Sequence, residues 1–178
     1  MNGIITTPRL RLREFSLDDT AFILELVNSK GWLRFIGDRN IHTREEAVHY
    51  LTNGPLKSYA ENGFGLWLVE LQDATPIGMC GLIRRNYLDH PDIGFAFLPQ
   101  YASKGYGYES AKAILDCAEN HLHFPGIYAI ATLDNEISHK LIEKLGLQFQ
   151  GLHPVQGSSE ALKVFYKDLQ QAGKVKIN

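Results

Sequence analysis

The chain has 178 residues, of which 44% are hydrophobic and 21% are charged, and its formal net charge is −2. This length fits one domain with a single hydrophobic core. The slightly negative charge argues against a nucleic-acid-binding protein that works by bulk electrostatics. No apolar run approaches the ~18 residues that span a bilayer, and Arg9, Arg11 and Arg13 interrupt the region where a signal peptide would be apolar. We therefore expect a cytoplasmic protein that binds neither nucleic acid nor membrane.

The first part of the chain predicts one strand followed by helices. Apolar and basic residues alternate over residues 10–13, which is the period of a strand with one buried face. Ser16 is a typical N-cap, and the aspartates that follow it suit the first turn of a helix. A second helix begins at Thr43, which has capping-box spacing with Glu46. Gly54 and Pro55 predict the end of that helix, and Pro55 is also a suitable first residue for another short helix.

The middle of the chain predicts three strands, at residues 64–71, 77–83 and 93–98. Their connections are short, which favours an antiparallel meander. Gly78, Gly81 and Gly94 lie inside these strands. Glycine in a strand indicates a bulge or the close approach of another backbone.

Helical spacing returns near Gly107, which opens a long helix. A buried strand follows at residues 127–132, and Asn135 then caps another helix that Gly146 ends. The inner face of that helix is predicted to contain Ile137, Leu141 and Leu145. Two final strands are expected at residues 147–152 and 161–169.

This order of elements predicts an α/β (α+β) fold, in which helices flank a mixed, mainly antiparallel sheet of about seven strands. In this prediction residues 1–178 form a single domain with its core at about residues 6–169. Cys80 and Cys117 lie in apolar surroundings and match no metal spacing, so we expect both to be reduced thiols.

The segment at residues 95–109 carries the strongest chemical signal, because a strand leads through a glycine-containing loop directly into a helix. The first turn of a helix has unpaired N–H groups and a partial positive charge. Gly105 and Gly107 allow the backbone to approach a bulky anion such as a pyrophosphate, and Lys104 adds a charge. The same pattern also fits a tight turn with no ligand. It is neither a P-loop, since no Gly-Lys-Ser/Thr is present, nor a dinucleotide fingerprint, since Ser110 stands at the third glycine position.

Residues 99–111 resemble motif A of the GNAT superfamily of N-acetyltransferases, whose pattern is Gln/Arg-x-x-Gly-x-Gly/Ala. The match places Gly105 and Gly107 on the two small positions. The run that begins at Lys104 is similar to the Lys-Gly-Tyr-Ala-Thr-Glu-Ala run of the branch that acetylates ribosomal-protein N-termini. Further segments resemble that branch in the same order: Thr-Pro-Arg-Leu-Arg-Leu-Arg at 7–13, Asp-Ile-Gly-Phe at 92–95, Asn-Glu-Ile-Ser at 135–138 and Glu-Lys-Leu-Gly-Leu at 143–147. The resemblance covers most of residues 6–169 and implies a GNAT-like fold.

The resemblance implies direct transfer of an acetyl group, within a ternary complex, from acetyl-CoA to a primary amine. The amine is either a protein N-terminal α-amine or a small molecule. In the family, strand amides ahead of the loop hold the pantetheine arm and the thioester carbonyl, which implies the amides of Phe97 and Leu98. Further cofactor contacts are implied for Ala102, Ser103, Lys104, Gly105, Tyr106, Gly107, Tyr108, Asn135 and Ser138.

Three positions depart from the family pattern. Ala102 stands at the Gln/Arg position, and Ser103 stands where glycine is common. Ile142 occupies the place of the tyrosine that many GNAT enzymes use as general acid. Isoleucine cannot donate a proton. Another group therefore protonates the leaving thiolate, or the thiolate leaves unaided, or catalysis has been lost.

Catalysis also needs a group that takes a proton from the amine. Asp92 is the first candidate, acting through an ordered water with a pKa raised by burial, and Glu14 and His90 are weaker candidates. Ser138 is the candidate for protonating the thiolate. Each has a plainer interpretation: Asp92 as a solvated strand end, Ser138 as a surface hydroxyl, and Asn135 as a helix cap only.

Trp32, Phe35 and Tyr87 are candidates for the wall of an acceptor pocket, although such aromatic residues also suit a core. His121 and His123 have no third ligand nearby, so we expect no metal site. Two alternative functions remain: a non-catalytic acyl-CoA-binding module of the same fold, which Ile142 favours, and an unrelated nucleotide-binding α/β protein. The sequence does not decide the acceptor, and exposed strand edges make a homodimer compatible with it.

Overall fold

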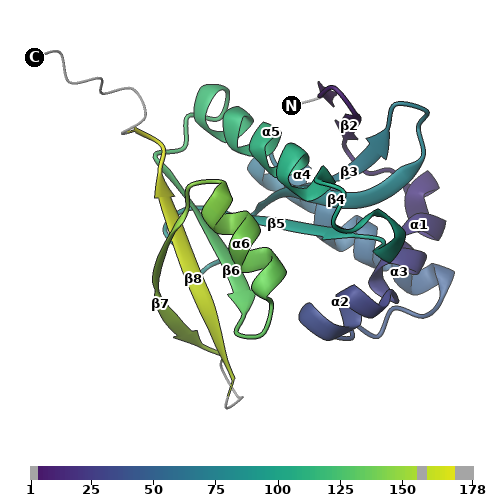
Figure 1. Ribbon diagram of the computed structural model, residues 1–178. Coiled ribbons are helices and arrows are strands. Elements are labelled where there is room, and N and C mark those ends of the chain that lie inside the picture. Colours follow the sequence, from purple (N-terminus) through teal and green to yellow (C-terminus); the bar gives the residue numbers. More distant parts are fainter. Residues whose placement is uncertain (1–3, 156–159, 171–178) are drawn as a thin grey trace, which may run out of the picture.

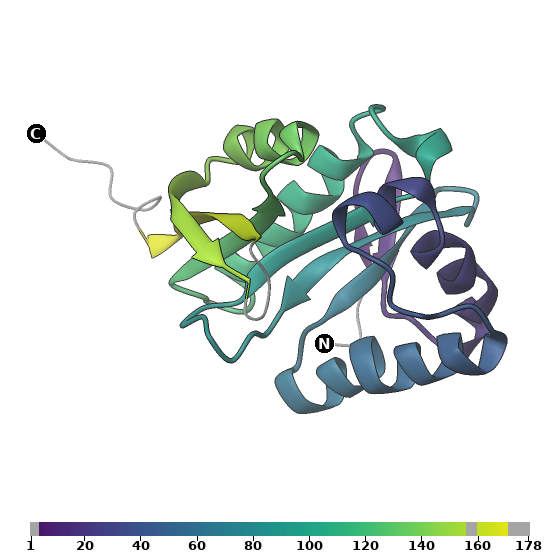
Figure 2. The same cartoon turned by 90° about the horizontal axis from the view of Figure 1, so that it is seen from below.

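The computed structural model describes residues 4–155 and 160–170, in which a mixed eight-stranded sheet lies between two layers of helices. One layer contains α5 (Tyr106–Asn120) and α6 (Glu136–Lys144). The other layer, on the opposite face of the sheet, contains α1 (Thr20–Val27), α2 (Lys30–Phe35), α3 (Arg44–Leu51) and α4 (Lys57–Asn62). Figures 1 and 2 show the two layers from the side and from below.

The strands run in the spatial order β1-β2-β3-β4-β5-β6-β8-β7. They are β1 (Ile5–Thr6), β2 (Leu10–Arg13), β3 (Leu66–Leu71), β4 (Pro76–Ile83), β5 (Asp92–Phe97), β6 (Gly126–Thr132), β7 (Gln148–Pro154) and β8 (Ala161–Asp168). Every neighbouring pair is antiparallel except β5 and β6, which are parallel. The predicted fold class and the β3–β4–β5 meander are therefore confirmed. The short edge strand β1 brings the sheet to eight strands where the sequence predicted about seven.

The two faces of the sheet carry separate cores. One core joins the sheet to α5 and α6 and contains Leu10, Ile93, Ile127 and Ile142. The other joins α1–α3 to Leu68 of β3, Met79 of β4 and Leu98, and its described members include none from β6, β7 or β8. The helices of this second layer therefore cover one half of the sheet and leave the other half uncovered on that face (Figure 2).

Two of the three glycines inside the strands, Gly78 and Gly81, mark places where backbones come close together, as predicted, whereas a Cβ on Gly94 would lie nearest to the side chains of Ile83 and Leu66. A Cβ atom on Gly81 would lie 2.2 Å from the carbonyl oxygen of Gly65, and one on Gly78 would lie 2.5 Å from that of Ala96. No side chain fits at either distance, so β4 must carry glycine at both positions.

The caps of the early helices are confirmed, but the predicted end of the second helix is wrong. Ser16 and Thr43 each form a capping box. The chain then passes without interruption from α3 through a π-helical turn (Thr52–Leu56) into α4, and Pro55 lies inside that turn. A π turn widens the helix locally and accommodates the missing N–H of proline. Gly54 and Pro55 therefore change the helix locally and do not terminate it.

Helix α6 begins and ends as predicted, and of the three residues expected on its inner face Leu141 and Leu145 pack against the core while Ile137 does not. The Asn135 side chain accepts a hydrogen bond from the N–H of Ser138. At the other end Gly146 has φ +87°, and its N–H and that of Leu147 bond back into the last turn, which is a Schellman motif. Ile137, expected to face inward, is 69% exposed, whereas Ile142 is 1% exposed.

An arginine with two carboxylate partners links β2, β3 and the first helical turn. Arg13 makes two hydrogen bonds of 2.8 Å to Asp19 and one of 2.9 Å to Glu70. Both carboxylates are buried. Burial alone would raise the pKa of Asp19, but the hydrogen bonds from Arg13 and Ser16 outweigh it and hold that pKa below its usual value.

Both cysteines of the chain are reduced thiols. Cys80 is buried, and burial raises the pKa of its thiol to about 12. Cys117 is half-buried and is also a thiol. None of the helices in the described ranges is long and apolar enough to cross a membrane.

We predict that Arg13→Ala lowers the free energy of unfolding by about 3 kcal/mol, because it leaves buried carboxylates unpaired. Arg11→Ala, on the same strand and with the same change of charge, should cost no more than about 0.5 kcal/mol. Urea denaturation measures both values. The pKa of Asp19 is depressed in the folded state, so its contribution is present above the ordinary pKa of aspartate and is lost as the pH falls. Equal stability of the two variants would contradict the prediction.

Candidate functional site

The sheet opens between β5 and β6. These two strands pair only at Asp92 and Tyr128, where the N–H of Tyr128 donates to the carbonyl of Pro91 at 3.0 Å. β5 has a central place in the sheet, yet its residues from Gly94 to Phe97 are only half-buried. A central strand is normally buried and paired on both sides. The two strands therefore part beyond the Asp92–Tyr128 pair, and one edge of β5 is left without a neighbouring strand.

The hydrogen-bond alternation of β4 and β5 shows which amides face this opening. The N–H of Leu98 donates to the carbonyl of Ile77 at 3.0 Å, so it is directed toward β4. In an antiparallel ladder the next N–H groups alternate in direction, which turns those of Phe97 and Phe95 toward the opening. The expectation for Phe97 fits this geometry. The N–H of Leu98, also expected at the cofactor, is already bonded to β4, whereas that of Phe95 faces the opening.

The N-terminus of α5 lies at the end of this opening, a few residues beyond β5. Its N-cap is Gly105, with φ +83°, and no side chain accepts a hydrogen bond from the first turn. The N–H of Glu109 bonds to the carbonyl of Gly105, so the N–H groups of Tyr106, Gly107 and Tyr108 have no helical partner. A left-handed residue followed by a helical one forms a concave nest of N–H groups that suits an anion.

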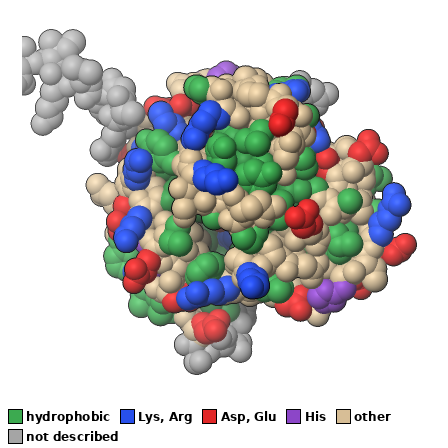
Figure 3. Space-filling view, turned by 45° about the vertical axis from the view of Figure 1, so that its right-hand side comes forward, with side chains coloured by type: hydrophobic (Ala, Val, Ile, Leu, Met, Phe, Trp, Pro, Cys, Tyr) green, Lys and Arg blue, Asp and Glu red, His purple; other side chains and the backbone are tan. Residues whose placement is uncertain are grey.

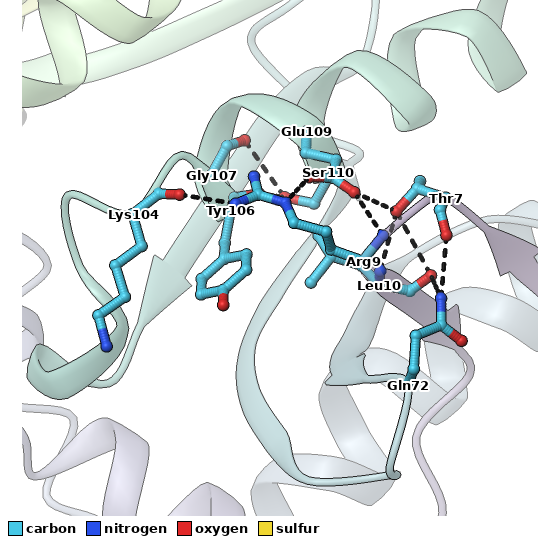
Figure 4. A network of polar contacts seen from close by, with 9 residues as sticks. All are labelled: Thr7, Arg9, Leu10, Gln72, Lys104, Tyr106, Gly107, Glu109 and Ser110. Carbon is cyan, nitrogen blue, oxygen red and sulfur yellow. Dashed lines mark hydrogen bonds and ion pairs between the residues drawn. The ribbon is translucent and has the colours of Figure 1, made fainter.

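The loop that leads into α5 is exposed over residues 102–105. Ser103 has φ +59° and Gly105 has φ +83°, so both have the left-handed backbone that a sharp turn needs. The ammonium of Lys104 lies 5.5 Å from the centre of the Tyr101 ring and leaves the loop on the side away from Arg9 (Figure 4). Lys104, Ala102 and Ser103 therefore lie in the exposed loop directly before the first turn of α5.

A network of polar contacts anchors this loop to the N-terminal segment (Figure 4). The carboxylate of Glu109 accepts hydrogen bonds from the Thr7 hydroxyl at 2.6 Å, the Arg9 N–H at 3.0 Å and the Arg9 Nε at 2.6 Å. Burial alone would raise the pKa of Glu109, but these hydrogen bonds hold it below its usual value. Arg9 and Glu109 lie 100 positions apart in the chain, so no local sequence pattern indicates this contact.

A recess lies on the face of the molecule shown in Figure 3. Hydrophobic side chains gather around it, and Lys and Arg side chains border it. A surface of this kind suits a ligand with an apolar part and an anionic part.

Asn135, Ser138 and Ile142, which the family resemblance singled out in and before α6, have different surroundings. The side-chain oxygen of Asn135 is occupied as a helix cap, at 3.1 Å from the N–H of Ser138. Ser138 is half-buried in the first turn of α6. Ile142 is buried in the core between α6 and the sheet, so the place of the family's tyrosine is filled by a packing residue.

Asp92 lies at the closed end of the opening and is 2% exposed. Its two carboxylate oxygens accept hydrogen bonds from Arg85 at 2.8 and 3.2 Å. Burial raises the pKa of Asp92, and the ion pair with Arg85 offsets only part of that effect. Arg85 was not among the residues predicted from the sequence. A basic residue close in the chain to a strand-end carboxylate was the signal that could have identified it.

The two weaker candidates for the base lie at different distances from the opening. His90 is half-buried, and its ring stacks near those of Tyr128 and Tyr166, with centres 6.3 and 6.0 Å apart. Glu14 follows β2, and the strands β3 and β4 separate β2 from β5. The structure thus brings His90, but not Glu14, to the place where β5 and β6 pair.

Helix α2 lies over the opening on the face opposite α5. It packs against β5, and its Arg34 reaches Asp134, in the turn before α6, at 3.3 Å. Trp32 is buried, and its indole N–H is the one buried side-chain donor of the described residues without a hydrogen-bond partner. Tyr87 stacks on His153 with ring centres 5.0 Å apart. Among residues 4–155 and 160–170, no group of three or more His, Cys, Asp or Glu is placed to hold a metal ion.

Comparison with known proteins assigns this arrangement to a family. The family model of the acetyltransferase (GNAT) domain matches residues 9–148. An uncharacterized N-acetyltransferase of Bacillus subtilis (strain 168), YnaD, is 26% identical over 148 residues, which are 83% of this chain and 84% of that protein. The chain therefore belongs to the GNAT acetyltransferases, and it is an acetyl-CoA-dependent acyltransferase.

Two kinds of solved structure share the fold. RimL, a ribosomal L7/L12 α-N-protein acetyltransferase in complex with coenzyme A, has a TM-score of 0.81 at 14% identity, covering 93% of this chain and 98% of that one. A mutant of the spermidine N-acetyltransferase SpeG from Vibrio cholerae has a TM-score of 0.72 at 22% identity, covering 93% and 96%. At these identities the likeness establishes the GNAT fold and leaves the acceptor undecided.

We predict that Gly107→Glu weakens acetyl-CoA binding at least about 100-fold. A Cβ on Gly107 would point toward Leu141 Cδ1, 2.9 Å away, and Phe97, 3.6 Å away, so the carboxylate would enter the mouth of the opening and repel a phosphate. An acidic residue near a helix N-terminus favours folding, so the variant should remain folded.

The matched control is Gly31→Glu on α2, where a Cβ would have nothing within 4 Å. Calorimetric titration of both variants with acetyl-CoA gives the comparison. Equal affinities would show that the anion does not bind at the N-terminus of α5.

Proposed function

We propose that this chain transfers the acetyl group of acetyl-CoA to the α-amine of a protein N-terminus, by direct attack within a ternary complex. The binding of acetyl-CoA, the acetyl donor, is supported by the opening between β5 and β6. This opening ends at the N-terminus of α5, whose cap residue Gly105 makes no side-chain hydrogen bond. An extended polar arm and an attached pyrophosphate need an unpaired strand edge followed by a nest of N–H groups. Both occur here in that order.

In this proposal the N–H groups of Phe95 and Phe97 hold the pantetheine arm. The N–H groups of Tyr106, Gly107 and Tyr108 bind the pyrophosphate, and Lys104 adds a positive charge. Ala102 and Ser103 contribute backbone groups of the loop, and neither has a long side chain. Because the donors are mostly backbone groups, the absence of the family's Gln/Arg at position 102 reduces affinity without removing the site.

The acceptor is proposed to approach from the face opposite α5, beneath α2. Support comes from the buried indole N–H of Trp32, which has no partner among the described residues. Buried donors are nearly always satisfied in native proteins, so this one is available to the carbonyl of a bound substrate. A peptide N-terminus has a carbonyl next to its amine, whereas a polyamine has none.

Catalysis requires a base for the amine and a means of stabilising the thiolate that departs. We assign the base to Asp92, because burial raises the pKa of its carboxylate above the ordinary value for aspartate. Because Asp92 is 2% exposed, the proton must pass through water. The hydroxyl of Ser138, in the first turn of α6, is the proposed donor to the thiolate in place of the tyrosine that Ile142 replaces.

An acceptor panel tests this proposal, with thiol release from acetyl-CoA as the measurement. We expect turnover with short peptides that have a free N-terminus, and none with the same peptides blocked at the N-terminus. Trp32→Phe should raise the KM for the peptide about tenfold while acetyl-CoA affinity stays unchanged, because one buried hydrogen bond is lost. Turnover of spermidine and not of peptides would reassign the acceptor. Acetyl-CoA binding without turnover of any amine would identify a non-catalytic acyl-CoA-binding module.

The role of Asp92 has a separate test. Asp92→Asn keeps the shape of the side chain and removes the base, so we expect kcat to fall at least about 100-fold with acetyl-CoA affinity unchanged. The acidic limb of the pH–rate profile should disappear in the variant. His90→Gln serves as the matched control and should stay within a few-fold of the parent. A fall in stability with kcat preserved would instead assign Asp92 to its ion pair with Arg85.

A further inference from the structure

Arg9 contacts the backbone of the loop that precedes α5. Its Nη1 donates to the carbonyl oxygen of Lys104 at 3.0 Å (Figure 4). The peptide bond between Lys104 and Gly105 is trans, so the N–H of Gly105 points away from the Lys104 carbonyl and hence away from Arg9. By holding one side of this peptide, Arg9 determines the direction of the N–H on the other side.

The position of Arg9 is itself fixed from three directions. Glu109 accepts from both its Nε and its backbone N–H. The guanidinium lies 4.7 Å from the centre of the Tyr106 ring. Its Nη2 is 3.2 Å from the place where a Cβ on Gly105 would stand. A planar guanidinium can meet a carboxylate and a carbonyl at once, which a lysine ammonium at this place cannot.

The contact places the positive charge of Arg9 close to the N-terminus of α5. A cation near a helix N-terminus is unfavourable, because that end already has a partial positive charge. Glu109 offsets one charge, and the Arg9 side chain, which is 48% exposed, lies along the loop and contacts its backbone. Such an arrangement is reasonable if an anion also binds there, because the loop must then be held open with its N–H groups directed outward.

We propose that Arg9 is a positioning residue for phosphate binding: through Lys104 it holds the loop so that the Gly105 N–H joins those of α5 around the pyrophosphate. This inference rests on the proposed function of the α5 N-terminus. It assigns the N-terminal segment, through Thr7, Arg9 and Glu109, to the support of the cofactor loop. It also explains how the loop keeps its shape with Ala102 in place of the longer side chain of the family motif.

A double-mutant cycle tests this role. The Kd for coenzyme A is measured by calorimetry for the parent chain, Arg9→Ala, Glu109→Gln and the double variant, and thermal unfolding confirms that each is folded. We expect each single variant to bind about tenfold more weakly. The double variant should bind no more weakly than Arg9→Ala, because Glu109 acts through Arg9. Arg9→Lys should also lose affinity, and it replaces Arg9→Ala in the cycle if the latter does not fold.

Arg11→Ala is the matched control, since it removes the same charge two positions along the chain and Arg11 has no ion pair among the described residues. Its affinity should stay within about twofold of the parent. Equal effects of Arg9→Ala and Arg11→Ala, or additive effects of the Arg9 and Glu109 changes, would overturn the inference. Failure of the parent chain to bind coenzyme A would instead contradict the proposed function and remove the basis of this inference.

Discussion

The site depends on one constraint: β5 is a central strand that is paired along only one edge beyond Asp92 and Tyr128. Unpaired backbone groups inside a protein cost free energy unless a partner satisfies them. On its other edge β5 pairs fully with β4, which directs alternate amides into the opening. Because α5 begins soon after β5 ends, the first turn of that helix is brought to the same opening. The strand edge and the helix end thus present N–H groups to the same opening, and in the proposed function these groups bind an elongated anionic ligand.

Two arginines of the N-terminal segment, Arg9 and Arg13, make different contacts. Arg13 lies between the buried carboxylates of Asp19 and Glu70 and ties β2 to β3 and the first helical turn. Arg9 precedes the same strand and ties the N-terminal segment to α5 through Glu109. The ion pairs of Arg13 stabilise the fold, and in our proposal the contacts of Arg9 position the loop before α5. Within β2, Leu10 and Leu12 alternate with Arg11 and Arg13 and are buried in the core.

Much of the fold follows from local chemistry that the sequence displays. Ser16, Thr43 and Asn135 cap their helices because their side chains reach a nearby N–H, and Gly146 ends α6 because it tolerates positive φ. Two errors have physical causes. Pro55 was accommodated by a π turn, and Ile137 was exposed because the buried stripe of α6 falls on His139 and Ile142. The N–H of Leu98 faces β4 because the direction of a strand amide depends on register. The contact of Arg9 with Glu109 depends on tertiary structure and leaves no local signal.

Titration with acetyl-CoA, with ATP as control, tests the central claim most directly. A ligand that binds only the native state adds about 2.7 kcal/mol to the free energy of unfolding at 100 times its Kd. Thermal unfolding and calorimetry should therefore agree on saturable binding of acetyl-CoA and on no binding of ATP at the same concentrations. Absence of acetyl-CoA binding up to millimolar concentration, or equal binding of ATP, would contradict the assignment of the β5–β6 opening and the α5 N-terminus to acetyl-CoA.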